Sequence, residues 1–219
     1  MRKATMLQWN RVAVTVLIGL LLPGHAAAQQ SVDELLTIPT LQQFAGGGLG
    51  AAAEGAPPEL EQFGQLVGFW HVDQEMRRQD GSWMSTAPGV WVWKYALGGY
   101  AVQDLWFQSV DNLPIYMAEL GHDYALTGLR TYDAPSGGWN IAWAANTGGS
   151  GPGADFGMLT GVLEAGDLVL SSPAEGDMPP QRIVFSDIEA DSFVWTSSFS
   201  RDGGETWMDV MRVTARRVR

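Results

Sequence analysis

The sequence predicts an all-β protein: an antiparallel up-and-down β-barrel of about ten strands, preceded by short N-terminal helices. Beyond residue 68, apolar residues recur mainly at every second position, which is the period of a half-buried strand. Hairpin-forming turn sequences such as Asp80-Gly81 and Asp202-Gly203-Gly204 separate the alternating segments. Short strands joined by hairpins indicate a sandwich or a barrel. Closure into a barrel also removes exposed sheet edges.

Residues 1–28 have the order of a secretory signal peptide. A positively charged start precedes the apolar residues 12–22, and residues 26–28 are the small alanines that signal peptidase requires. The apolar segment is too short to cross, as a helix, a bilayer core of about 30 Å. We therefore expect cleavage before Gln29, a periplasmic or secreted bacterial protein, and no stable membrane span after cleavage.

The composition excludes several classes of protein. The chain has no cysteine, which excludes disulfides, thiolate metal ligands and cysteine nucleophiles. An exported chain without disulfides suits a bacterial periplasm. The formal net charge is −11, and it becomes more negative when the basic leader is lost. Because such a surface repels phosphate backbones, we expect no nucleic-acid partner.

Residues 29–57 are expected to form a short helix followed by a Gly- and Ala-rich linker. Ser31 opens the helix with a capping box, and Pro39 ends it. Residues 45–57 carry a single charge and are expected to be flexible. The β-barrel domain then covers residues 58–219 and starts with a further short helix.

Eleven segments of the barrel domain are expected to be strands. If the side chain of Trp70 points into the barrel, alternation places Val72 and Gln74 inside and His71 outside. The expected strands are residues 71–78, 90–97, 100–108, 115–121, 124–133, 139–146, 156–163, 168–172, 181–187, 193–200 and 206–216.

The segment Leu66-Val67-Gly68-Phe69-Trp70 resembles the Gly-x-Trp signature at the first strand of lipocalin-like calycin barrels. In those barrels the tryptophan closes one end, and a basic residue near the last strand packs over it in a cation–π contact. The resemblance therefore implies structural roles for Gly68 and Trp70. It points to Arg212 or Arg216 as the basic residue.

Residues 66–70, 126–133 and 185–207 together resemble a bacterial calycin-like domain family of unknown function, over roughly residues 58–217. The family implies a fold but no reaction. Related haem-binding calycins use a histidine late in the chain, and none follows His122 here. We expect no cofactor and no metal, because the two histidines beyond the leader are too few for a histidine-rich zinc site.

Residues 200–207 are similar to the Asp-box of sialidases and other β-propellers, Ser-x-Asp-x-Gly-x-Thr-Trp. The side chain of Asp202 can cap the turn amides, glycine permits a positive φ, and Trp207 anchors the hairpin. In propellers the box is structural and repeats in each blade, whereas it occurs once here. It therefore predicts a hairpin and not a glycosidase.

Aromatic side chains gather on one face of several expected strands, as Trp91 does with Trp93. Small barrels either fill their interior or hold one ligand, and aromatic walls with a few polar groups suit a pocket. Arg130 could supply the charge for an acidic ligand. His122 lies beside Asp123 at a strand end, where it could act as an acid, a base or a ligand. The candidate ligand-binding residues are Trp93, Tyr100, Asp104, Trp106, His122, Arg130 and Trp143.

Three functional hypotheses remain open. We expect a non-catalytic barrel that binds a small hydrophobic, aromatic or sugar-like molecule, with the Gly-rich residues 146–157 as a loop at its rim. The second hypothesis is an enzyme with an acid/base site at the barrel mouth, formed by His122, Asp123 or Asp104. The third is a structural or interaction protein with a filled core. Tight packing of the tryptophans on one another would favour the third.

Overall fold

The protein is described here by a computed structural model. The expected signal peptide and most of the Gly-rich residues 146–157 lie outside the described residues. Within the described part of the chain, eleven antiparallel strands form one sheet. The described residues are 30–86, 88–113, 115–147, 155–173 and 179–219.

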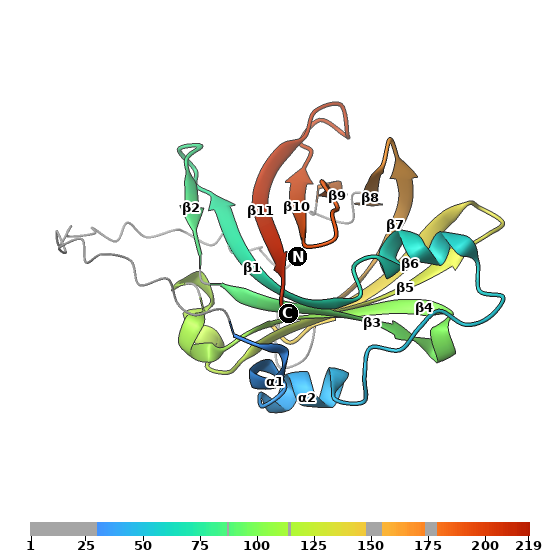
Figure 1. Cartoon of the computed structure of the whole chain (residues 1–219). Coiled ribbons are helices and arrows are strands. Elements are labelled where there is room, and N and C mark those ends of the chain that lie inside the picture. The colour runs from blue at the N-terminus through green and yellow to red at the C-terminus, as the bar shows by residue number, and fades with distance from the viewer. Residues whose placement is uncertain (1–29, 87, 114, 148–154, 174–178) are drawn as a thin grey trace, which may run out of the picture.

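The strands follow one another around a closed barrel (Figure 1). The last strand pairs with the first, so that β1 and β3 to β11 close a barrel of ten strands, and β2 pairs with the far end of β1. The predicted fold class is confirmed. The strands are β1 (Gly68–Arg77), β2 (Trp83–Ser85), β3 (Gly89–Ala96), β4 (Ala101–Gln108), β5 (Tyr124–Asp133), β6 (Gly138–Ala145), β7 (Asp155–Glu164), β8 (Asp167–Ser172), β9 (Gln181–Ser186), β10 (Ser192–Phe199) and β11 (Met208–Arg217).

One expected strand is wrong. Residues 115–121 were expected to extend the sheet, but the structure has a 3₁₀ helix, η4 (Ile115–Leu120), after the single turn η3 (Val110–Asn112). The segment ends in Met-Ala-Glu-Leu, residues that favour a helical backbone over an extended one. The short strand β2 was not expected from the sequence, and it pairs only with the last residues of β1.

The predicted alternation along the first strand is confirmed. Trp70, Val72 and Gln74 are buried, whereas Asp73 is exposed. His71 is half-buried on the outer side, where its Nε2 lies 3.4 Å from the carbonyl oxygen of Gln30. The same alternation continues in the neighbouring strands, so that every second side chain faces the barrel interior.

Two short helices precede the barrel, α1 (Val32–Leu35) and α2 (Pro39–Ala45). Ser31 forms the expected capping box with Glu34. Pro39 was expected to end the helical segment, but it is the first residue of α2. At that position its missing N–H costs nothing, because the first amides of a helix have no partner within it.

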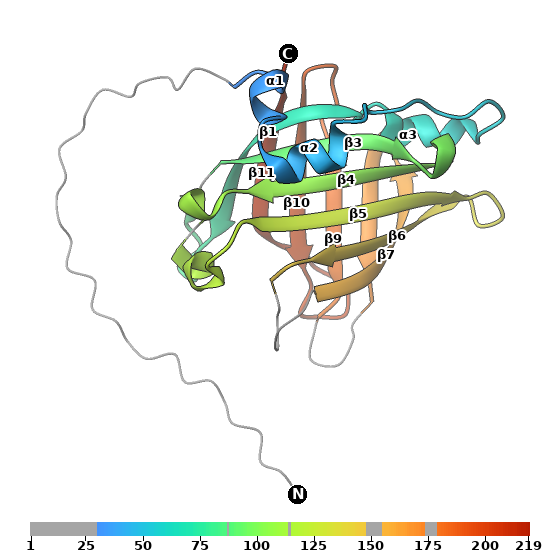
Figure 2. The ribbon, with the colours of Figure 1, turned by 90° about the horizontal axis from the view of Figure 1, so that it is seen from below.

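The two helices lie against the outer face of the sheet, α1 beside β1 and α2 along β3 (Figure 2). Leu35 and Leu41 are fully buried there against the outward side chains Phe69, Val92 and Leu105. The Gly- and Ala-rich segment after α2 is attached to the barrel by backbone hydrogen bonds. One joins residues 95 and 49 at 2.8 Å, and another joins residues 53 and 99 at 3.0 Å.

A helical plug fills one end of the barrel. It consists of η1 (Pro58–Leu60) and α3 (Glu61–Gly64). Leu60, Phe63 and Leu66 are almost completely buried, and each contributes about 1.5–3 kcal/mol by leaving water. The ring of Phe63 lies edge-on to Trp139 at 4.8 Å between centroids and stacks on Trp93 at 6.1 Å.

Arg217 lies in the last strand, β11, and contacts both the first strand, β1, and the backbone that follows the plug. Its guanidinium lies 4.1 Å from the ring of Trp70 and donates to the carbonyl oxygens of Val67 at 2.8 Å and Gln65 at 3.0 Å. A Cβ at Gly68 would lie 2.3 Å from an Arg217 nitrogen, so this close approach requires glycine.

The expected cation–π contact over Trp70 is therefore present, but the choice of Arg212 or Arg216 as its basic residue is wrong. Arg212 lies over the ring of Trp83 at 3.8 Å, and Arg216 pairs with Asp73 on the outer surface. The reason is strand alternation: positions 213, 215 and 217 of β11 face inward, and positions 212 and 216 face outward.

The Asp-box-like turn forms the hairpin between β10 and β11. The carboxylate of Asp202 accepts hydrogen bonds from the hydroxyl and the amide of Thr206, at 2.5 and 2.9 Å, and from the Ser200 hydroxyl at 2.7 Å. These bonds hold the pKa of Asp202 well below its ordinary value, the Thr206 hydroxyl contributing most. Trp207 is half-buried at the end of the turn.

No helix in the described part of the chain has both the length and the apolar character needed to cross a membrane.

We predict that Arg217→Met destabilises the protein by about 2–4 kcal/mol, because the carbonyl groups of Gln65 and Val67, directly after the plug, lose a charged donor. The matched control is Arg216→Met, whose partner Asp73 is 63% exposed and whose loss costs at most about 1 kcal/mol. Equilibrium denaturation in guanidinium chloride compares the two variants. Equal losses would contradict the role assigned to Arg217.

Candidate ligand-binding site

The barrel interior beyond the plug contains a cavity of about 530 Å³. Its volume lies in the range of small-molecule sites, about 300–1,000 Å³. The described side chains leave this space open, which is contrary to the filled-core hypothesis. The lining residues are Gln74, Trp91, Asp104, Trp106, Gln108, Met117, Tyr124, Leu126, Gly128, Arg130, Ile141, Trp143, Thr147, Asp155, Leu159, Leu170, Gln181, Ile183, Phe185, Trp195 and Met211.

The lining changes in character from the mouth to the floor. Gln108, Asp155 and Gln181 are terminal residues of their strands and mark the mouth. Tryptophan and aliphatic side chains form the walls below them. Asp104 and Arg130 lie toward the plug, since the guanidinium of Arg130 lies over the rings of Phe63 and Trp93. The cavity is therefore apolar in its middle and polar at its two ends.

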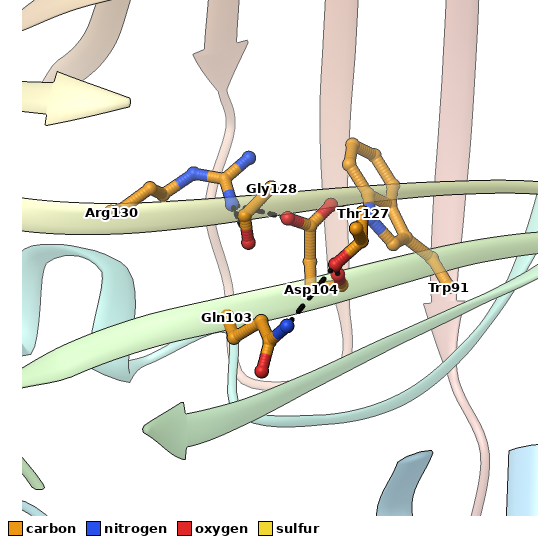
Figure 3. Close-up of polar contacts among 6 residues, drawn as sticks. All are labelled: Trp91, Gln103, Asp104, Thr127, Gly128 and Arg130. Atoms are coloured by element: carbon orange, nitrogen blue, oxygen red, sulfur yellow. Dashed lines mark hydrogen bonds and ion pairs between the residues drawn. The ribbon is translucent and has the colours of Figure 1, made fainter. Parts of the chain in front are cut away.

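An ion pair forms the floor of the cavity (Figure 3). Asp104 pairs with Arg130, and the two side chains are 0% and 6% exposed. The other carboxylate oxygen of Asp104 accepts a hydrogen bond of 2.6 Å from the Trp91 indole. The guanidinium lies over the rings of Trp93 at 4.3 Å and Phe63 at 5.1 Å. The charge of Arg130 is thus compensated within the protein.

Two glycines make room for this arrangement. In the sheet, Gly128 lies between Asp104 and Trp143, and Trp143 lies between Gly128 and Gly157. A Cβ at Gly128 would lie 2.6 Å from the Asp104 carboxylate, and a Cβ at Gly157 would lie 2.6 Å from the Trp143 ring. Both distances are far below van der Waals contact. The ion pair and the indole therefore use space that only glycine leaves free.

Three polar atoms of lining residues are buried without a hydrogen-bond partner in the described part of the chain. They are Gln74 Oε1, Trp106 Nε1 and Arg130 Nε. Almost all buried polar groups of native proteins have a partner, and an unpaired one costs about 1–3 kcal/mol. Neighbouring protein atoms cover these three, so a ligand would reach them only after the side chains rotate.

Four of the seven candidate ligand-binding residues line the cavity, and Trp93 lies behind it. Trp93 is fully buried between Arg130 and the plug, so it supports the floor without lining the cavity. The four lining residues are Asp104, Trp106, Arg130 and Trp143.

Tyr100 and His122 lie outside the cavity. Tyr100 is 53% exposed, and its hydroxyl donates to the carbonyl oxygen of Glu54 at 3.4 Å. It precedes β4 directly after the helical turn η2 (Leu97–Gly99), so the alternation of the strand does not apply to it. His122 is exposed in the loop before β5, and its Nδ1 lies 2.9 Å from the carbonyl oxygen of Asp123.

The acid/base candidates therefore do not meet at the mouth. The carboxylate of Asp123 accepts a hydrogen bond from the backbone amide of Val110 at 2.9 Å, which ties it to the neighbouring loop. Asp104 lies at the other end of the cavity, where it pairs with Arg130 and accepts a hydrogen bond from the Trp91 indole. His122 and Asp123 are absent from the described lining.

Several wall residues of the later strands, including Trp195 and Met211, were not predicted from the sequence. The inward direction of Trp195 could have been predicted from the sequence. Phe193 is fully buried in β10, and Trp195 follows it at the strand period of two. Trp195 also lies edge-on to Trp91 at 6.2 Å between centroids, a contact across the barrel that sequence spacing does not reveal.

No protein-family model and no curated protein matches this chain. Among solved structures, Rv2717c from M. tuberculosis is similar with a TM-score of 0.53 and 15% identity, over 75% of this chain and 99% of that chain. The S-type phycobiliprotein lyase CPES from Guillardia theta has a TM-score of 0.48 and 10% identity, over 73% of this chain and 92% of its own. Together with the closed ten-strand barrel, the first similarity supports a calycin-like fold.

We predict that Arg130→Met destabilises the protein by about 3–5 kcal/mol, because it leaves the carboxylate of Asp104 buried without its cation. The double variant Asp104→Asn/Arg130→Met should regain most of this loss, since the amide oxygen of the introduced asparagine still accepts from the Trp91 indole. Chemical denaturation of wild type, single and double variants measures the coupling. A double variant less stable than Arg130→Met would contradict the prediction.

Proposed function

We propose that the protein binds a small, largely apolar molecule inside the barrel and has no catalytic machinery of its own. The observation that carries the proposal is the cavity of about 530 Å³ with walls of tryptophan and aliphatic side chains. Each methylene-sized group that leaves water for such walls contributes about 0.8 kcal/mol. Affinity should therefore rise with the apolar size of the ligand until the cavity is full.

The polar side chains at the mouth support binding in one orientation. Gln108 and Gln181 carry amides that can both donate and accept hydrogen bonds. A ligand with a polar group at one end would place it among these amides and its apolar part against the indoles below. A few polar groups in a mainly apolar pocket are the usual source of orientation in small-molecule sites.

We predict that the folded protein, recovered from a bacterial periplasm, carries a bound small molecule. Native mass spectrometry should show an added mass that is lost on denaturation. The same preparation, once stripped of ligand, should bind the apolar dye N-phenyl-1-naphthylamine and change its tryptophan fluorescence. A bare protein mass together with no response to the dye would contradict the proposed function.

A cavity-filling variant tests whether the dye binds inside the barrel. Leu126 lines the cavity, whereas Leu129 on the same strand faces outward by alternation. Leu126→Trp should abolish dye binding and leave cooperative unfolding intact. The matched control Leu129→Trp adds the same side chain to the opposite face and should leave dye binding unchanged. Equal dye affinity in both variants would show that the dye binds elsewhere.

We also propose that the chain is exported and cleaved before Gln29, as the order of charged, apolar and small residues in the leader suggests. Expression of the full chain in a bacterium should give a periplasmic protein whose N-terminal sequence starts at Gln29. Ala28→Leu should block cleavage, because signal peptidase requires a small residue there. A cytoplasmic protein that keeps its leader would contradict export.

A further inference from the structure

We propose that the cavity selects an uncharged, ring-bearing ligand over an anionic one, because Asp104 cancels the charge of Arg130 at its floor. This inference rests on the proposed function and specifies the class of ligand. It also argues against the suggestion from the sequence that Arg130 could supply the charge for an acidic ligand. Three features support it: the charges of the lining, the way Arg130 is held, and the shape of the walls.

The charged side chains among the described lining residues do not favour an anion. They are Arg130, Asp104 and Asp155. Asp155 lies at the mouth and accepts a hydrogen bond from the hydroxyl of Thr147. An anion entering the cavity would pass this carboxylate. It would also be repelled by the overall negative charge of the protein, which is −11 for the full chain. Loss of water from a charged group is strongly unfavourable unless a partner replaces it.

The charge of Arg130 is already compensated by Asp104. Its Nη1 pairs with Asp104, the same nitrogen lies 3.5 Å from the Gly128 carbonyl oxygen, and its guanidinium plane is covered by Trp93 at 4.3 Å. An anion that approached the other N–H groups of the guanidinium would still lie close to the Asp104 carboxylate, whose negative charge opposes it. An anion that displaced Asp104 would leave the carboxylate buried with only the Trp91 indole as a donor, which is strongly unfavourable.

The walls favour flat rings. Trp91, Trp106, Trp143 and Trp195 reach the cavity from four different strands. Trp91 lies at 59° to Trp106 and at 82° to Trp195, so the indoles present both faces and edges. Aromatic rings prefer offset-stacked and edge-to-face contacts, and such walls therefore suit a ring-bearing molecule. Its polar end can be uncharged, because the groups at the mouth are mainly amides.

A matched pair of dyes tests the selection by charge. N-phenyl-1-naphthylamine is neutral, and 1-anilinonaphthalene-8-sulfonate is the same molecule with an added sulfonate. Fluorescence titration of the ligand-free protein should give a dissociation constant for the neutral dye at least about tenfold below that of the sulfonate, a factor that corresponds to about 1.4 kcal/mol. Phe156→Ala removes an outward ring that is 69% exposed and should change neither constant.

The variant Asp104→Asn tests the cause. It leaves Arg130 charged and uncompensated, so the sulfonate should gain about tenfold or more relative to the neutral dye. The double variant Asp104→Asn/Arg130→Met has no charge at the floor and should keep the wild-type preference, which provides a test even if the single variant does not fold.

The outcomes separate the inference from the proposed function. If neither dye binds the wild-type protein, the proposed function fails. If both dyes bind equally, or the sulfonate binds more tightly, the cavity binds ligands but does not select against anions, and the inference is overturned. A folded Asp104→Asn protein with unchanged preference, or a double variant that has lost it, would also overturn the role of the ion pair.

Discussion

The number of strands in the closed barrel is the constraint on which the rest of this structure depends. About eight strands enclose a space that inward side chains can just fill, and ten enclose more. This protein fills one end of the larger interior with its own chain, through the plug of η1 and α3. The plug does not extend to the other end, and the remaining space is the cavity. The cavity is therefore a consequence of barrel width and plug length together.

The plug and the floor of the cavity are one continuous packing unit. Phe63 stacks on Trp93, and both rings contact the guanidinium of Arg130, which in turn holds Asp104. At the outer side of the plug, Arg217 covers Trp70 and binds backbone carbonyls. A change in how the plug packs would thus reach the floor through rings in direct contact. The residues that pack the plug therefore also form the floor of the cavity.

Much of this fold could be predicted from the sequence, because period two and turn residues are local signals. The inward direction of Trp70 and Val72 follows from alternation alone. The strand prediction for residues 115–121 was wrong because a short apolar run fits both a strand and a helical turn. Arg217 was missed because its partner depends on register: a shift of one residue exchanges the inner and outer faces of β11.

The candidate site was predicted less completely, because residue type indicates chemistry but not what a side chain pairs with. Arg130 was chosen correctly as a lining residue, but as a free charge. Val102 pairs with Arg130 in the sheet and Gly128 pairs with Asp104, so the two charged residues are diagonal neighbours on one inner face. Nothing within either strand's own sequence shows this pairing. It comes from the register between β4 and β5, and it compensates the charge that Arg130 could have offered to an acidic ligand. In this barrel, register decides whether the charge of Arg130 is compensated, whereas composition indicates only that the interior is aromatic.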